Sequence, residues 1–342
     1  MKKIFFTVLF SSVLIFSAIG CNPTKENNDS LSLLLLGALA SSSNSTEDLS
    51  CQNKTLNWTI QNSAADNVWS AVTYGDNKFV AIATNGANPA MTSPDGITWT
   101  AHPTSEGGSF ISLTYGNGLF VTVSPTATVK VMSSPDGATW TDRNAAVLNS
   151  WTSVTFANGT FVAVSSNGAN QAMTSPDGIT WTSRTIPVAT TPWQIVTYGN
   201  GLFLALSSSG KVVTSPDGIS WTERNDVANN IWTGAKYGNN IFVAVSGTGI
   251  GNRAMSSPDG ITWTPRAATE ANTWTSLAYG GGLFVAISQD GTNRIMTSTD
   301  GINWKAQAAP EQKSWKSITY ANKKFVAVSF DSPSKVMTAS CE

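Results

Sequence analysis

Six aspartates recur along this chain at intervals of 40 to 42 residues, each in a Ser-Pro-Asp-Gly or closely similar sequence. A carboxylate can act as an acid, a base or a nucleophile, and two carboxylates suffice for glycoside hydrolysis. Six near-identical copies, however, indicate a repeated element of the fold. Proline and glycine favour a tight turn, and an aspartate oxygen can accept bonds from the backbone N–H groups in it. We therefore interpret them as structural turn residues: Asp95, Asp136, Asp177, Asp217, Asp259 and Asp300.

Other residues that could support catalysis are few. His102 is the sole histidine, which argues against a His-based triad and a His-rich metal site. Arginines stand three residues after a tryptophan in four repeats, which places them at an outer rim: Arg143, Arg184, Arg224 and Arg266. We name no catalytic residue, no metal ligand and no cofactor. A pair of loop carboxylates remains open as the basis of a hydrolase or lyase.

Five basic residues also recur, each two positions before a methionine or valine: Lys130, Lys211, Arg253, Arg294 and Lys335. One interpretation is a broken basic rim that contacts an anionic glycan or an acidic protein surface. The other is a set of solvated side chains, partly neutralised by nearby acids: Asp226, Glu270, Asp290 and Asp331. We favour the second.

The elements that position these residues are short. In residues 151–184, β-rich runs at 151–156, 161–165, 171–174 and 179–182 are separated by glycine- and asparagine-rich turns. Such a pattern predicts a four-stranded antiparallel meander, and a period near 40 residues predicts an array of such blades. Four aromatic columns have seven members each, led by Trp58, Trp69, Tyr74 and Phe79. We predict an all-β, seven-bladed β-propeller.

The two ends of the repeat array complement each other. Trp58 comes first with no earlier strands of its repeat, and the last repeat stops where its turn should begin. We therefore predict that residues 56–60 complete the seventh blade and close the ring. Cys51 and Cys341 flank this junction, which predicts a disulfide between them that intact mass under non-reducing conditions would test.

The turn sequence resembles the Asp-box of BNR-type propellers, with glycine one residue early in Ser175-Pro176-Asp177-Gly178-Ile179-Thr180-Trp181. The resemblance covers about residues 51–342 and implies the fold. Proteins of this type include sialidases, other glycosidases, photosystem assembly factors and non-enzymatic binding proteins, so it leaves function open. The Arg-Ile-Pro motif that accompanies the sialidase arginines is absent from the sequence.

The N-terminus reads as an export signal. Lys2 and Lys3 precede an apolar run, and the sequence before Cys21 resembles a bacterial lipobox with alanine where leucine is usual. We predict a lipoprotein signal peptide at 1–20, a tether at 21–50 with an apolar segment at 31–40, a lipid on Cys21, and the propeller at 51–342. The expected location is the bacterial cell envelope, on the outer membrane or cell surface.

Charge and loop chemistry indicate the kind of partner. Without the first 20 residues, 18 basic and 21 acidic residues remain, which disfavours nucleic-acid binding. The loops between the second and third strands of each repeat vary in length and chemistry, as do the links between repeats, such as 101–109, 144–150, 185–192 and 267–273. We expect a membrane-anchored, extracytoplasmic binding module for adhesion or envelope assembly, which meets a protein or glycan on this variable face. The alternative is a carbohydrate-active hydrolase or lyase with its site in the axial funnel.

Overall fold

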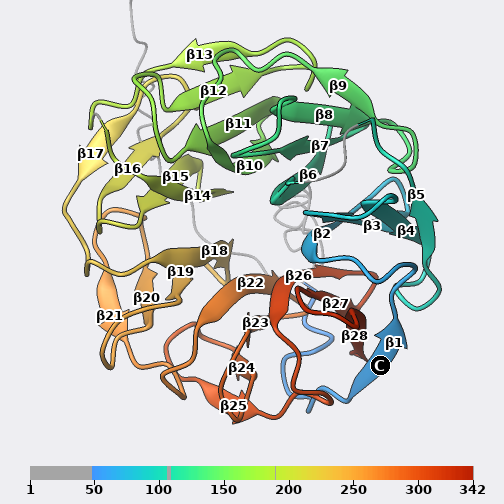
Figure 1. The fold of residues 1–342 in the computed structure, drawn as a ribbon. Helices are drawn as coiled ribbons and strands as arrows, with labels where there is room; N and C mark the ends of the chain where they lie inside the picture. The colour runs from blue at the N-terminus through green and yellow to red at the C-terminus, as the bar shows by residue number, and fades with distance from the viewer. Residues whose placement is uncertain (1–47, 106–108, 189, 342) are drawn as a thin grey trace, which may run out of the picture. The chain divides into compact units, whose positions relative to one another are not determined.

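The computed structural model describes residues 48–105, 109–188 and 190–341. Within these residues, 28 strands form seven four-stranded antiparallel sheets, and no helix occurs. The sheets stand as blades around one axis, with the first strand of each blade innermost (Figure 1). This confirms the predicted seven-bladed propeller. No helix of the described residues is long and apolar enough to cross a membrane.

We number the blades by sequence and call their strands A to D from the axis outward. Blade 1 holds β2 (Trp69–Gly75), β3 (Lys78–Ala83), β4 (Ala90–Ser93) and β5 (Thr100–His102). Blade 2 holds β6 (Ser112–Gly116), β7 (Leu119–Val123), β8 (Val131–Ser134) and β9 (Thr141–Arg143). Blade 3 holds β10 (Trp151–Ala157), β11 (Thr160–Ser165), β12 (Ala172–Ser175) and β13 (Thr182–Arg184). Blade 4 holds β14 (Trp193–Gly199), β15 (Leu202–Ser207), β16 (Val212–Ser215) and β17 (Thr222–Arg224).

The remaining blades follow the same plan. Blade 5 holds β18 (Trp232–Gly238), β19 (Ile241–Ser246), β20 (Ala254–Ser257) and β21 (Thr264–Arg266). Blade 6 holds β22 (Trp274–Gly280), β23 (Leu283–Ser288), β24 (Ile295–Ser298) and β25 (Lys305–Gln307). Blade 7 holds β26 (Trp315–Ala321), β27 (Lys324–Ser329), β28 (Lys335–Ser340) and, as its outer strand, β1 (Trp58–Asn62).

The N-terminal strand closes the ring, as predicted. β1 runs antiparallel to β28, with Trp58 opposite Ala339 and Gln61 opposite Val336. It begins and ends two residues later than the predicted segment 56–60. Leu56 is excluded from the strand because it is buried in the core between blades 6 and 7, where its carbonyl accepts a 2.5 Å bond from the Gln307 amide.

The Ser-Pro-Asp-Gly turns join strands C and D through the aspartate, as in blade 2. Asp136 Oδ1 accepts bonds from the N–H groups of Ala138 (2.8 Å) and Thr139 (2.7 Å). The Ser134 hydroxyl donates to the same oxygen at 2.9 Å and accepts the Gly137 N–H at 2.8 Å. Gly137 has φ +74°, a conformation that glycine adopts without strain. Equivalent serine–aspartate bonds occur at the other five turns.

This bonding corrects the predicted start of strand D. In blade 3 the strand was expected at 179–182 but begins at Thr182. The N–H groups of Ile179 and Thr180 bond to Asp177 Oδ1 at 2.9 and 2.8 Å, so they are not available to pair with strand C. The residues between the aspartate and the tryptophan therefore belong to the turn.

The core lies between blades. The tryptophans that open strand A are at most 1% exposed: Trp69, Trp151, Trp193, Trp232, Trp274 and Trp315. The tyrosines that end strand A are only half-buried. Their rings pack on strand B, as in the 4.9 Å separation of the Tyr198 and Phe203 ring centroids, while the Tyr198 hydroxyl accepts a 2.7 Å bond from Asn158.

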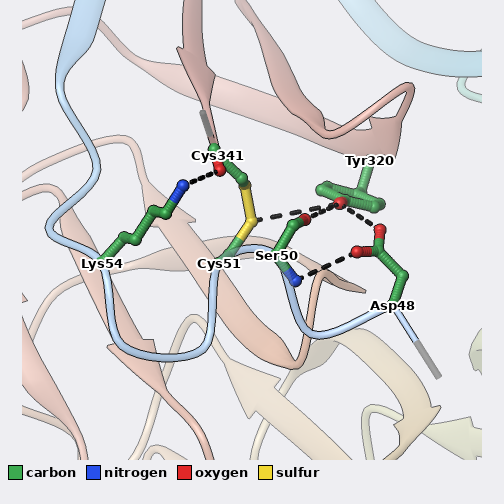
Figure 2. Close-up of a disulfide and its surroundings, with 6 residues drawn as sticks. All are labelled: Asp48, Ser50, Cys51, Lys54, Tyr320 and Cys341. Carbon is green, nitrogen blue, oxygen red and sulfur yellow. Dashed lines mark hydrogen bonds between the residues drawn. A yellow bond between two sulfur atoms is a disulfide. The ribbon is translucent and has the colours of Figure 1, made fainter.

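The two cysteines lie where the sequence places them. Cys51 and Cys341 have Cα atoms 4.8 Å apart and sulfurs at bonding distance, the geometry of a disulfide (Figure 2). The Lys54 ammonium donates a 2.5 Å bond to the Cys341 carbonyl, and the Tyr320 hydroxyl donates a 2.6 Å bond to Asp48. Gly281 makes room for this segment, since a Cβ there would stand 2.4 Å from Cys51 Sγ. The oxidised state in the cell stays a prediction.

The predicted export features lie outside the described residues. These are the signal segment 1–20, Cys21, and the tether up to residue 47, with its apolar segment at 31–40. They therefore stay predictions.

The turn aspartates predict a pH-dependent stability. Burial opposes the charge on Asp136, but the bonds from Thr139, Ala138 and Ser134 outweigh it and lower its pKa from 3.8 to about 2. A carboxyl with a lower pKa in the folded state stabilises the protein above the unfolded pKa of about 3.9, and this contribution is lost as the pH falls toward 2.

We expect Asp136→Ala to lower the free energy of unfolding at pH 7 by about 1–2 kcal/mol, because it leaves N–H groups of the turn unpaired. The loss should shrink at pH 2 to 3, and Asp136→Asn, which keeps one acceptor oxygen, should lose less. Denaturant unfolding at both pH values measures this. An equal loss at both would contradict a role for the charge.

Candidate functional site

The blades present two unlike faces. The A–B and C–D turns form one face, which we call the turn face, and the B–C loops and D–A links form the other, which we call the loop face. The turn face repeats the same aspartate bonding from blade to blade. Differences between blades are concentrated on the loop face and along the axis.

Buried or half-buried asparagines clamp the loop face. In blades 1, 3, 5 and 6, an asparagine two residues before the strand A tryptophan donates a 2.7–3.0 Å bond to a carbonyl of the B–C loop: Asn67, Asn149, Asn230 and Asn272. A glycine of that loop packs against each amide. These residues were missed in the sequence, where asparagine in a loop is typical of a turn. The available signal was their constant place before the tryptophan.

The five basic residues bond locally. Lys211 Nζ pairs with Asp226 at 2.9 Å and Glu223 at 3.3 Å. Arg253 donates to the carbonyls of Gly247 and Asn272, which ties the B–C loop of blade 5 to the following link. Lys130, Arg294 and Lys335 bond to Pro125, Gly291 and Asn62. In the described part of the chain, Lys211 is the one of the five with an acidic partner, and the role as a ligand rim stays a prediction.

The four acids that were expected to neutralise the five basic residues have different hydrogen-bond partners. Asp226 does pair with Lys211. Asp290 and Asp331 instead accept the N–H groups of Thr273 and Ser314, and Glu270 accepts that of Asn293. These three carboxylates cap backbone groups of the loops, which explains their positions without any basic partner.

The rim arginines and the histidine form hydrogen bonds between strands C and D of their own blades. Each arginine lies on strand D and donates from Nε to a serine or threonine of strand C, at 2.8–3.0 Å: Arg143, Arg184, Arg224 and Arg266. His102 takes the same place in blade 1, 2.9 Å from Thr92 Oγ1, and desolvation lowers its pKa. Within the described residues, no group of three or more His, Cys, Asp or Glu has the arrangement of a metal site.

The axial channel is walled by the A strands of all blades and has a volume of about 360 Å³. Hydroxyls of its wall join neighbouring blades. Thr152 Oγ1 donates to the Trp193 carbonyl at 2.8 Å, and Ser153 Oγ accepts the Val196 N–H at 3.0 Å. Among the described residues that line the channel, Lys236 and Lys316 are the charged ones. The carboxylate pair of the hydrolase alternative is not among them.

A second cavity of about 250 Å³ opens beside blade 5. Its apolar lining includes Val227, Met255, Trp263 and Pro265, with Asp226 at its edge. Trp263 is half-buried here, whereas its counterparts in blades 1 to 4 are at most 9% exposed. The outer-strand tryptophans of blades 6 and 7, Trp304 and Trp58, are half-buried as well, so Trp263 is distinguished by the cavity that it lines.

One sequence difference lies at the cavity. Two residues after the strand D arginine, the link before blade 4 has Ile186, which is 2% exposed in the core, whereas the link before blade 5 has Asp226. Asp226 turns out of the apolar space to pair with Lys211. A charged residue at this position therefore leaves Trp263 half-buried, while Met255 stays only 2% exposed.

Apolar side chains are exposed next to this cavity. Ile250, in the B–C loop of blade 5, is 99% exposed, and Ile231 is 43% exposed. The Ile231 carbonyl accepts the Gly247 N–H at 3.0 Å, which holds it beside the same loop. We call the cavity together with Ile231 and Ile250 the blade 5 patch.

Comparisons with known proteins identify the fold. No protein-family model matches the chain, and no curated protein matches it. A catalytically inactive virginiamycin B lyase from Staphylococcus aureus, solved with quinupristin, has a TM-score of 0.74 at 13% identity and covers 84% of this chain and 99% of its own. YCF48 from Cyanidioschyzon merolae has a TM-score of 0.63 at 14% identity, covering 83% and 98%.

Two further structures bear on the comparison. YCF48 bound to D1 peptide has a TM-score of 0.63 at 14% identity and covers 83% of this chain and 96% of its own. The propeller domain of Cps50 (Swd1) from Myceliophteria thermophila has a TM-score of 0.60 at 10% identity, covering 83% and 99%. At such identities the likeness shows the fold, and this chain is similar to these proteins as a seven-bladed β-propeller.

Proposed function

We propose that this protein is an extracytoplasmic binding module that docks a protein partner through the loop face, with the blade 5 patch as its anchor point. The observation that carries the proposal is the half-buried Trp263 in the wall of an apolar cavity, together with the 99% exposed Ile250 in the B–C loop of the same blade. Binding energy in protein interfaces concentrates in buried aromatic and aliphatic anchors that fill pockets. A cavity of about 250 Å³ lined by Trp, Met, Val and Pro suits an apolar side chain of the partner.

The loop face has the rigidity that such a role requires. The asparagine clamp and the backbone caps hold its loops to the blades at 2.6–3.0 Å. Preorganised loops lose little entropy when a partner binds. A propeller of the same fold, YCF48, has been solved with a bound D1 peptide, which supports a protein partner for this architecture.

The direction of chain entry agrees with this use of the loop face. The described chain begins at Asp48, beside Tyr320 at the end of strand A of blade 7, and so enters on the turn face (Figure 2). The loop face lies on the other side of the ring from this entry point.

The binding proposal predicts a specific pattern in a screen of peptide and glycan arrays with the whole protein. Peptides with an aromatic or branched aliphatic residue should bind. Asp226→Ile, which places in this link the residue that fills the equivalent space in blade 4, should weaken binding at least about tenfold by occluding the pocket. Ile250→Asp should weaken it as well.

Two matched variants serve as controls. Asp226→Asn removes the ion pair with Lys211 but leaves the pocket open, so binding should persist. Leu148→Asp adds the same charge at another exposed apolar residue, 80% exposed in the link before blade 3, and should also bind normally. Glycan binding that survives Asp226→Ile, or the absence of any peptide ligand, would refute the proposal.

We further propose that a lipid on Cys21 holds the module at the bacterial envelope, on the outer membrane or cell surface. The support is the charged and apolar start of the chain and its lipobox-like sequence before Cys21. Cys21→Ser should move the protein from the membrane fraction to the soluble fraction and remove a fatty-acid label. Retention in the membrane fraction without the label would contradict lipid anchoring.

A further inference from the structure

The axial channel has two polar levels that differ in bonding. At the second residue of strand A, nearer the loop face, hydroxyls donate to the strand A carbonyl of the next blade, at 2.5–2.8 Å: Ser70, Thr152, Thr233 and Thr275. These groups hold the ring together. At the fifth residue, nearer the turn face, the channel is lined by further threonines: Thr73, Thr114, Thr155, Thr197 and Thr319.

The hydroxyls of these five threonines make no hydrogen bond with any residue that the structure describes. Each is the fifth residue of the A strand or its equivalent, one from each of five blades. A hydroxyl can donate as well as accept a hydrogen bond. The fifth-residue level is thus a ring of available donors inside a narrow channel.

Two lysines interrupt these levels. Lys236 takes the fifth position in blade 5, among the threonines, and Lys316 takes the second position in blade 7. The second and fifth residues of strand A are three residues apart along the strand, so the two levels are separated by about 10 Å along the axis. Lys316 Nζ lies 5.5 Å from the centroid of the Phe330 ring, and Phe330 also lines the channel.

Neither ammonium has an acidic partner in the described part of the chain. The described salt bridges involve Lys78 and Lys211, on the surface. Desolvation by the wall lowers the pKa of both channel lysines. Lys236 is exposed to the channel and Lys316 is half-buried, whereas threonine or alanine occupies the Lys236 position in the other blades. An ammonium that faces the channel without an acidic partner can donate charge-assisted hydrogen bonds to an anion there.

We propose that the axial channel binds a small organic polyanion, one that carries two or more carboxylate or phosphate groups. Lys236 and the threonine hydroxyls hold one anionic group, and Lys316 holds another nearer the loop face. Charge-assisted hydrogen bonds to oxyanions are the strongest that these side chains form, and a channel wall with positive charge alone concentrates anions. A volume of about 360 Å³ is sufficient for a ligand of this size.

Isothermal titration of the whole protein with citrate and with pyrophosphate at low salt tests this site. We expect saturable binding of one anion per chain. Lys236→Met and Lys316→Met should each weaken it at least about tenfold, the effect of losing one charge-assisted bond, and the double variant should abolish it. Lys305→Met, which removes the same charge from the exposed strand β25, should change the affinity by less than twofold.

Thermal unfolding without ligand shows whether the variants are folded. Loss of an unpaired channel cation should leave the midpoint unchanged or raise it, so weaker binding cannot be ascribed to misfolding. Asp226→Ile should bind anions like the wild type, which separates this site from the blade 5 patch. No binding of either anion, or equal affinity in the double lysine variant, would overturn the proposal.

Discussion

The pairing of β1 with β28 is the constraint on which the rest of the structure depends. Five residues from the start of the described chain complete a sheet made by its end, with Trp58 opposite Ala339 and Asn62 opposite Lys335. Without this strand, β28 would be an open edge and blade 7 would be incomplete. Because each blade packs on its neighbours, the separation between the A strands, and hence the channel, depends on a closed ring. Cys51, Cys341 and Tyr320 reinforce the same junction.

Closure lets the two faces serve different purposes. The turn face repeats one solution to the C–D bend, in which an aspartate oxygen satisfies two N–H groups. The loop face keeps a fixed clamp but varies in the side chains outside it, and blade 5 departs furthest. Asp226 replaces a core residue. Ile250 projects into solvent, and Lys236 projects into the channel. The blade thus combines standard strands with residues that serve no evident packing role.

Sequence periodicity predicted the fold because the repeated residues are those that pack or turn. The seven members of each aromatic column gave the blade count, and the incomplete ends gave the closing strand. Strand D was misplaced because propensity treats Ile179 as a strand former, whereas the Asp177 carboxylate binds its N–H. Asn272 was missed because asparagine in a loop is typical of a turn, although its constant place two residues before a strand A tryptophan was a signal. The pocket at Trp263 depends on the outward turn of Asp226, which requires coordinates. The sequence shows Lys236 where other repeats have threonine or alanine. It does not show that this residue lines the axial channel.

Native-state hydrogen exchange is the most direct test of ring closure. If β1 is an integral strand of blade 7, its amides that bond to β28 should exchange with the same free energy as those of the central strands, through global unfolding. The amides around Ile60 should then be as protected as those around Val326 in β27. Fast exchange in residues 58–62 while β26 to β28 stay protected would contradict a ring held shut by this strand.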